Sequence, residues 1–243
     1  MSSSTPPPPD PAPGPPPAPA VAGEIFGEQL GPAGRFVAIL ADTGVSHGLI
    51  GPREVPRLWE RHVLGCAVVA EAMPREGASV IDVGSGAGLP GIALAIARPD
   101  LQVTLVEPML RRTTWLTESV AGLGLSNVTV CRGRAEEFHG QLVADYVTAR
   151  AVAALGKLAA WCAPLIAVGG ELVVMKGDKA SEELTAAAPV MARLGLETGT
   201  ILTVGTTLPQ PTTLVVARKV RDGAPGGTSR RSGKGSRPTR HRK

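Results

Sequence analysis

The chain has few aromatic residues, few cysteines and no long apolar run. Three tryptophans, three phenylalanines and one tyrosine among 243 residues leave few rings on which bases could stack, which argues against a dedicated single-strand RNA module. Cys66, Cys131 and Cys162 lie far apart without a CxxC pair or a histidine cluster, so we expect neither a zinc site nor a disulfide framework. No basic start with an apolar stretch and no apolar run of about 18 residues occurs, so we expect a cytoplasmic protein without membrane contact.

Both ends of the chain have compositions that do not form a packed core. Residues 5–19 contain ten prolines, and we expect residues 1–22 to be an extended, disordered arm. Residues 221–243 hold eight basic residues against one aspartate, a net charge of +7. Since the whole chain carries +4, residues 1–220 carry −3. We expect a flexible tail that either contacts the phosphate backbone of RNA or stays solvated.

Between the ends, the apolar periodicity changes once. It is helical from about 23 to 72, and after Pro74 short apolar runs alternate with longer helical segments,. This alternation predicts one α/β domain over 23–220, with N-terminal helices over 23–72 and a mostly parallel sheet covered by helices on both faces. The expected strands are 79–83, 102–106, 127–131, 143–149, 170–175, 198–204 and 212–218, and the expected helices 89–97, 110–122, 153–166 and 181–193. The last two strands have no helix between them, so they should form an antiparallel hairpin.

A glycine-rich loop, VGSGAGLPG, follows the first predicted strand. Read from Gly86, it fits the GxGxxG fingerprint of dinucleotide-binding proteins; read from Gly84, it resembles the first motif of methyltransferases. The apolar run ends at Val83, so the tight turn should begin at Gly84, which favours the second reading. A seven-stranded sheet with a terminal hairpin also resembles the class I S-adenosylmethionine-dependent methyltransferase (Rossmann-like) fold. An NAD-dependent oxidoreductase remains the alternative.

Acidic residues follow the second and third predicted strands. Glu107 could accept hydrogen bonds from both ribose hydroxyls of an adenosine cofactor, or be an ordinary exposed carboxylate,. After the third strand, Glu136 could accept from an adenine amino group, while Ala135 offers its backbone amide.

Two kinds of methyl acceptor lack their usual motifs. Residues 145–151 contain no Asn/Asp-Pro-Pro-aromatic tetrapeptide, which argues against an exocyclic amine as the target. Neither Cys131 nor Cys162 has the proline context of a nucleophile that methylates carbon 5 of pyrimidines,.

Several motifs together resemble the RsmG (GidB) family of bacterial 16S rRNA guanine-N7 methyltransferases over about residues 25–218. They are GSGAGLPG at 84–91, ARP at 97–99, VE at 106–107 with Arg112, RAEEF at 134–138, ARA at 149–151 and MKG at 175–177. Arg61 and His62 also resemble the family's helix before the first strand. The chain departs from the family at Gly65 and Cys66, where an Asp-Ser pair is usual.

The resemblance implies transfer of the methyl group of S-adenosylmethionine to N7 of a guanine in 16S rRNA or the small ribosomal subunit. The N7 lone pair can attack in line without a general base, so we expect no catalytic acid or base. We also expect no metal site and a monomer. A ribosome-binding protein that keeps the fold without turnover is a further alternative. The expected cofactor-binding residues are Gly84, Gly86, Leu89, Glu107, Ala135, Glu136 and Arg150.

Basic residues near the carboxyl ends of the strands are candidates for further contacts. Arg150 follows strand four, where it could hold the cofactor carboxylate or the target nucleotide, or form a partly buried structural pair with Asp145 or a helix-end carbonyl. Arg111, Arg112 and Lys176 could contact RNA phosphates or be solvated surface charges. We expect His62 and His139 to be packed or surface histidines rather than catalysts.

Deletion of residues 221–243 tests the role of the basic tail. If the tail contacts phosphates, the truncated chain should bind RNA more weakly and with a flatter salt dependence, because fewer counterions are released. Cofactor binding should persist. RNA affinity measured against salt concentration checks this, and an unchanged slope would reject the contact.

Overall fold

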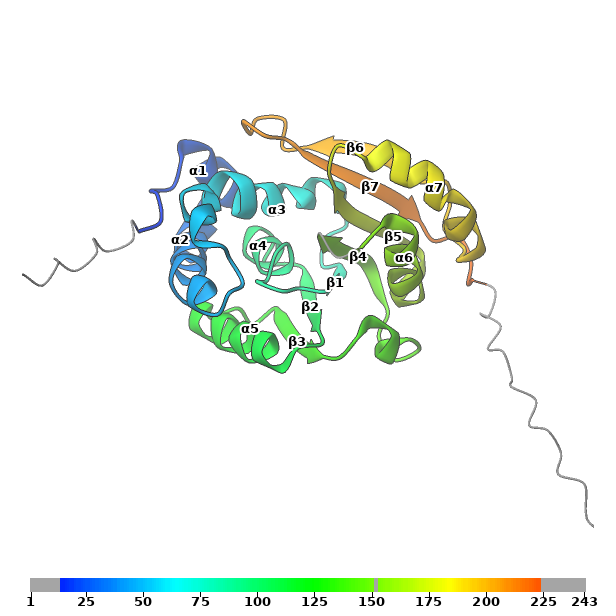
Figure 1. The fold of residues 1–243 in the computed structure, drawn as a ribbon, viewed down its shortest axis with the longest axis horizontal. Helices are drawn as coiled ribbons and strands as arrows, with labels where there is room; N and C mark the ends of the chain where they lie inside the picture. Colours follow the sequence, from blue (N-terminus) through cyan, green and yellow to red (C-terminus); the bar gives the residue numbers. More distant parts are fainter. Residues whose placement is uncertain (1–13, 151–152, 224–243) are drawn as a thin grey trace, which may run out of the picture.

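The computed structural model describes residues 14–150 and 153–223. Their centre is a seven-stranded sheet in the order β3-β2-β1-β4-β5-β7-β6 (Figure 1). Strands β1 to β5 run parallel, and β7 runs antiparallel to both β5 and β6. The predicted mixed sheet with a terminal hairpin is therefore confirmed. The strands are β1 Ser79–Val83, β2 Gln102–Glu107, β3 Val128–Arg132, β4 Ala144–Arg150, β5 Ile166–Lys176, β6 Thr200–Val204 and β7 Thr212–Arg218.

Helices cover both faces of the sheet. The α-helices are α1 Ala20–Phe26, α2 Leu30–Ile39, α3 Gly65–Ala67, α4 Gly91–Ala97, α5 Leu110–Leu123, α6 Leu155–Cys162 and α7 Ala180–Arg193. Figure 1 shows α6 and α7 on one side, and α4, α5 and the N-terminal helices on the other. Alternate strand residues supply the two cores: Val80 belongs to the cluster under the N-terminal helices and Ile81 to the cluster under α6 and α7,.

Short 3-10 and π-helical segments connect these helices. The 3-10 segments are η1 Gly27–Gln29, η3 Pro52–Arg57, η5 Val68–Ala72, η6 Ala135–Phe138 and η7 Ala163–Leu165, and the π-helical ones are η2 Leu40–Gly44 and η4 Leu58–Leu64. In η4, a buried face that includes Trp59, His62 and Leu64 packs inward. The segment η3 leads directly into η4.

Several element boundaries differ from the sequence expectation by one to four residues, and three of the differences have a local physical cause. Strand β5 begins at Ile166 rather than 170, because a bulge in the pairing with β4 lets the two strands resume their register,. Helix α6 ends at Cys162 because Pro164 cannot continue its hydrogen bonding, and η7 follows,. Helix α4 begins at Gly91 rather than 89, because Leu89 and Pro90 belong to the preceding turn.

The N-terminal helical region begins earlier than expected. Helix α1 starts at Ala20, and Ala22 is fully buried. The carbonyl of Pro16 accepts a hydrogen bond from the Trp59 indole at 3.1 Å. The boundary at 22 therefore needs correction, since α1 begins at Ala20 and Pro16 already contacts the domain. Residues 1–13 of the predicted arm and 224–243 of the predicted tail lie outside the described residues.

None of the described helices combines the length and the apolar character needed to span a bilayer.

Replacing Gly91 by alanine should destabilise the fold. A Cβ there would lie 2.3 Å from Leu105 Cδ2 and 2.7 Å from Asp82 Oδ2, so we expect a loss of about 1–3 kcal/mol in the free energy of unfolding. Gly122→Ala is the control, because a Cβ at this exposed position of α5 meets nothing within 4 Å. That change should stabilise the protein by about 0.5–1 kcal/mol. Urea unfolding measures both, and equal midpoints for Gly91→Ala and wild type would contradict the argument.

Candidate functional site

A pocket opens at the carboxyl edge of the parallel strands. Its volume is about 710 Å³, and residues that end or follow β1, β2, β3 and β4 line it. The chain passes from β1 outward to β2 on one side, while β4 lies on the other side of β1. Such a reversal of strand order opens a crevice where α/β proteins bind ligands. The pocket therefore lies where the topology predicts a site.

The glycine loop after β1 forms one side of the pocket. Gly84, Gly86 and Gly88 have φ values of 73°, 54° and 75°, which favour glycine because other residues are strained there. The amides of Gly84 and Ser85 donate to Val106 O at 2.8 and 3.2 Å, which ties the loop to β2. The loop backbone therefore borders the pocket at Gly84 and Gly86, where no side chain lies in between.

Glu107 connects this loop to the second strand. Its side chain is 2% exposed. Oε2 accepts from the Gly86 amide at 3.1 Å and Oε1 from the Met109 amide at 3.0 Å. Each carboxylate oxygen has two lone pairs, so each can accept a further hydrogen bond from a ligand hydroxyl. The alternative of an exposed strand-end carboxylate is wrong, because Glu107 is buried in the pocket wall.

Asp82 of β1 holds the far end of the glycine loop in place. Its carboxyl group is fully buried, and Oδ2 accepts from the Gly91 amide at 3.0 Å. Oδ1 has no hydrogen-bond partner among the described residues. Burial raises the pKa of Asp82 to about 7, because the charged form loses its hydration. Asp82 is therefore a structural acid that is partly protonated near neutral pH.

The segment after β3 forms another side of the pocket. Ala135 is buried and Glu136 exposed, at the start of η6, and both line the pocket. Gly133 lets the chain turn closely here, since a Cβ would lie 2.8 Å from the Phe138 ring. Trp161 of α6 also lines the pocket. The structure thus brings Ala135 and Glu136 to the same pocket as Glu107, and Leu89 lines it too.

The N-terminal region supplies a further part of the lining that sequence reasoning missed. The residues are Leu49, Ile50, Gly51, Glu54 and His62. We expected His62 to be a packed or surface histidine; it is packed, but it also lines the pocket. The Arg61-His62 motif was the available signal. The inward direction of the His62 side chain depends on the π-helical turn of η4. Turns of this type often occur at functional sites.

Arg150 is the last residue of β4 and lines the pocket together with the N-terminal residues Glu54 and His62. Nη1 lies 3.1 Å from Cys66 Sγ, and Nη2 donates to His62 Nδ1. The alternative of an ion pair with Asp145 is wrong, since that carboxylate pairs with Arg75 and accepts from Ser79. Burial raises the pKa of the Cys66 thiol, which keeps it neutral,.

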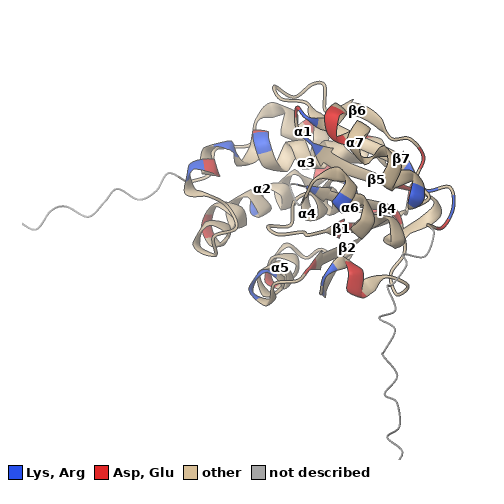
Figure 2. Cartoon of the chain, turned by 45° about the vertical axis from the view of Figure 1, so that its right-hand side comes forward, with Lys and Arg blue, Asp and Glu red and all other residues tan. Residues whose placement is uncertain are grey.

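The three other predicted cations lie in different surroundings. Arg112 lines the pocket, with Nη1 3.8 Å from Glu107 Oε2. Arg111 is exposed beside it at the start of α5, where Figure 2 shows basic segments. Lys176 is 8% exposed, and its Nζ bonds Glu183 and the Ala153 carbonyl, each at 2.8 Å. The interpretation of Lys176 as an RNA contact needs correction, because its ammonium group is held within the protein.

The described residues contain no group of three or more histidine, cysteine or acidic side chains that could hold a metal ion. Cys66, Cys131 and Cys162 are free thiols.

Comparison with known proteins relates the sequence to one family. A family model described as GidB, rRNA small subunit methyltransferase G, matches residues 29–210. A protein of Thermobifida fusca named ribosomal RNA small subunit methyltransferase G is 57% identical over 195 residues, covering 80% of this chain and 82% of that protein. A protein of the same name from Streptomyces coelicolor is 55% identical over 207 residues, covering 85% and 86%.

Solved structures show the same fold at low sequence identity. A methyltransferase from Pyrococcus furiosus has a TM-score of 0.51 and 14% identity, covering 65% of this chain and 82% of that chain. Pyrococcus horikoshii TYW2, solved in complex with MeSAdo, has a TM-score of 0.50 and 15% identity, covering 64% and 61%. These likenesses confirm the class I methyltransferase fold.

The pKa of Asp82 predicts a component of stability that falls as pH rises. Its ordinary pKa is 3.8 and its folded value about 7, so the folded state binds more protons than the unfolded state between these values. Stability from this group is complete below the ordinary pKa and is lost as pH rises through about 7. Asp82→Asn keeps an acceptor for Gly91 but has no proton to release.

The free energy of unfolding, measured by urea at each pH for both proteins, checks this. Between about pH 5 and 7, the free energy of unfolding of wild type should fall by at least about 1 kcal/mol relative to that of Asp82→Asn. Parallel curves for the two proteins would contradict the assignment.

Proposed function

Because the chain belongs to the GidB family of rRNA small subunit methyltransferases, we propose that it transfers the methyl group of S-adenosylmethionine to N7 of a guanine in 16S rRNA. The observation that carries the proposal is the division of the pocket. One side combines the glycine loop with the buried Glu107, and the other surrounds the guanidinium of Arg150. The first suits an adenosine cofactor and the second a polar acceptor.

The donors and acceptors of the first side fit S-adenosylmethionine, which supplies an activated methyl group when bound. Gly84, Gly86 and Leu89 would border the methionine and ribose. Glu107, with a free lone pair on each oxygen, would accept from the ribose hydroxyls,. The rim formed by Ala135 and Glu136 would hold adenine through a backbone amide and a carboxylate.

The sheet topology disfavours the NAD-dependent alternative. The doubly wound dinucleotide fold has a sixth strand parallel to the others. In this chain β7 inserts antiparallel between β5 and β6. The hairpin and the loop register from Gly84 favour the methyltransferase interpretation.

The chemistry of the acceptor side fits a nucleophile that needs no activation. Guanine N7 carries an in-plane lone pair at neutral pH, so orientation and removal of water are the main tasks of the protein. Methylation of carbon 5 of a pyrimidine needs a thiolate that reaches the base. Cys66, the thiol beside Arg150, is fully buried, and burial raises its pKa. It is therefore a poor nucleophile.

Arg150 is the residue best placed to hold the acceptor or the cofactor carboxylate. Its contacts with His62 and Cys66 use two of the five N–H donors of a guanidinium,. The remaining donors can bind a guanine oxygen, a phosphate or a carboxylate. Arg111 and Arg112 would add phosphate contacts at the rim. The substrate would be free 16S rRNA or the small ribosomal subunit, and the enzyme a cytoplasmic monomer.

Methyl transfer to 16S rRNA and to small ribosomal subunits, measured with labelled S-adenosylmethionine, tests the proposal. Label should appear on a guanine as N7-methylguanine, located by cleavage of the RNA chain at that base. Arg150→Ala should lower the rate about 100-fold, because a misplaced reactant costs about that much. Arg193→Ala, an exposed change at the end of α7 and outside the pocket lining, is the control.

Label on a pyrimidine or an exocyclic amine, or the absence of label, would contradict the proposal. Absence of label together with binding to the small subunit would favour the non-catalytic alternative. Calorimetry with S-adenosylhomocysteine and with NAD distinguishes the two cofactor classes, since we expect only the first to bind.

A further inference from the structure

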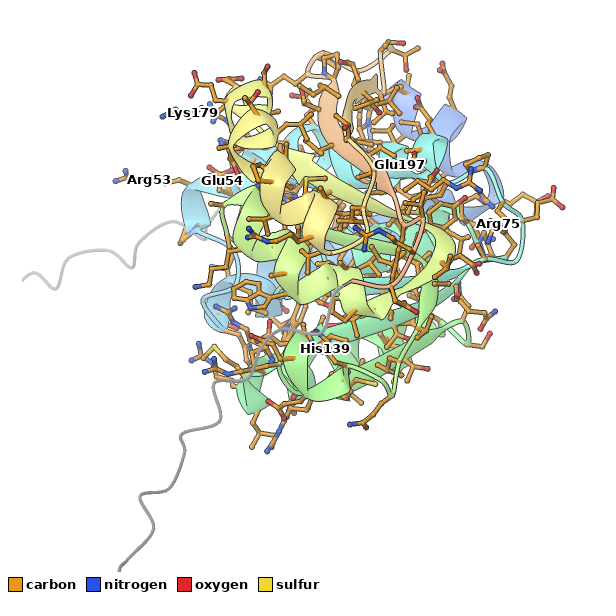
Figure 3. All side chains as sticks on the ribbon, turned by 90° about the vertical axis from the view of Figure 1, so that its right-hand side faces the viewer. Arg53, Glu54, Arg75, His139, Lys179 and Glu197 are labelled. Atoms are coloured by element: carbon orange, nitrogen blue, oxygen red, sulfur yellow. The ribbon has the colours of Figure 1, made fainter. Side chains whose placement is uncertain are left out.

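His62 occupies the space between an acid of the N-terminal region and the cation at the end of β4. It is 8% exposed and belongs to η4. Its Nε2 lies 2.9 Å from Glu54 Oε2, and its Nδ1 contacts Arg150 Nη2. All three side chains line the pocket. Figure 3 shows the labelled Glu54 beside Arg53, at the edge of the molecule.

The contacts determine where His62 carries its proton. A guanidinium only donates hydrogen bonds, so Nδ1 must accept from Arg150 and carry no proton. The proton of the neutral ring is then on Nε2, which donates to the Glu54 carboxylate. Burial, with the Arg150 charge as the next cause, holds the pKa of His62 below its usual value. The neutral ring is therefore the form present at neutral pH.

The other contact of Arg150 is weaker. Cys66 is a neutral thiol, and sulfur is a weak acceptor,. No carboxylate pairs with Arg150 in the part of the chain that the structure describes. The ring nitrogen of His62 is thus the strongest acceptor that this guanidinium has. It comes from a region remote in sequence, 88 residues away.

We propose that His62, oriented by Glu54, is a positioning residue that holds the Arg150 guanidinium toward the acceptor side of the pocket. The role rests on the proposed function, because Arg150 is there the group that orients the acceptor or the cofactor carboxylate. His62 contacts neither of these groups directly and acts through Arg150. The N-terminal helical region is then part of the reaction machinery.

The arrangement makes methyl transfer sensitive to acid. Protonation converts Nδ1 from an acceptor into a donor and places two cations in contact, so Arg150 loses its position. The charged groups that face His62 are Glu54 from η3, Arg150 from β4 and Arg61 on its own segment. Glu54 raises the His62 pKa, while the two arginines lower it. The rate should therefore be constant at neutral pH and fall as pH drops below the ordinary histidine value of 6.5.

A matched pair of variants separates the two ring nitrogens. In His62→Asn the amide oxygen takes the place of Nδ1 and can still accept from Arg150. In His62→Gln the amide takes the place of Nε2 and reaches Glu54 instead. We expect kcat to fall less than about 5-fold in the first and about 10- to 100-fold in the second. Calorimetric affinity for the cofactor should match wild type in His62→Asn, where Arg150 keeps its acceptor, and matching urea midpoints of the two variants exclude a general loss of folding.

The pH profile adds a readout that a purely structural role would not change. His62→Asn should lose the acid limb of the wild-type profile, and Glu54→Gln should move that limb to lower pH because the carboxylate no longer favours protonation. His139→Gln is the control. Figure 3 labels His139 far from Glu54, and its profile should match wild type.

Nitrogen NMR of the full-length protein with labelled histidines gives a result independent of activity. The signals of His62, identified by their loss in His62→Gln, should show a protonated Nε2 and a bare Nδ1 at neutral pH. A protonated Nδ1 would overturn the proposal, and so would equal kcat values and profiles in the two variants when wild type methylates N7. A wild type that transfers no methyl group to N7 contradicts the proposed function instead, and the NMR signals still decide whether His62 accepts from Arg150.

Discussion

The hydrogen bond between the buried Asp82 carboxyl group and the Gly91 amide fixes the geometry on which the pocket depends. It joins β1 to the first residue of α4 across the glycine loop. With both ends held, the loop closes through residues of positive φ, and its Gly86 amide meets Glu107. Burying a carboxyl group is costly, and the protein limits that cost by raising the pKa of Asp82 to about 7,.

The site combines two parts of the chain with different roles. The α/β domain supplies the loop and Glu107, which act as a rigid cradle because they end buried strands. The N-terminal helical region supplies Glu54 and His62, which meet the cradle at Arg150. Since neither part forms the pocket alone, the shape of the pocket depends on the packing of the N-terminal helices on the sheet.

Much of the fold and about half of the site follow from local patterns. Alternating apolar runs predict strands because a parallel sheet buries both faces, and a glycine loop after Val83 predicts the ligand cradle because only glycine tolerates its backbone angles. Glu107 could be found because strand ends share an edge. The start of β5 at Ile166 could not be predicted, because it depends on a bulge in the pairing with β4.

The sequence by itself determined the fold class, the family resemblance, the position of the glycine loop and the residues that line the pocket beside it. Only the tertiary structure decided what each cation does. Arg150 and Lys176 look alike as basic residues at strand ends, yet Lys176 is neutralised by Glu183 while Arg150 meets an uncharged histidine. The partners of Arg150 lie 84 and 88 residues away in sequence. A pattern along the chain does not show which of these remote residues meet, because their contacts depend on how the N-terminal helices pack against β4.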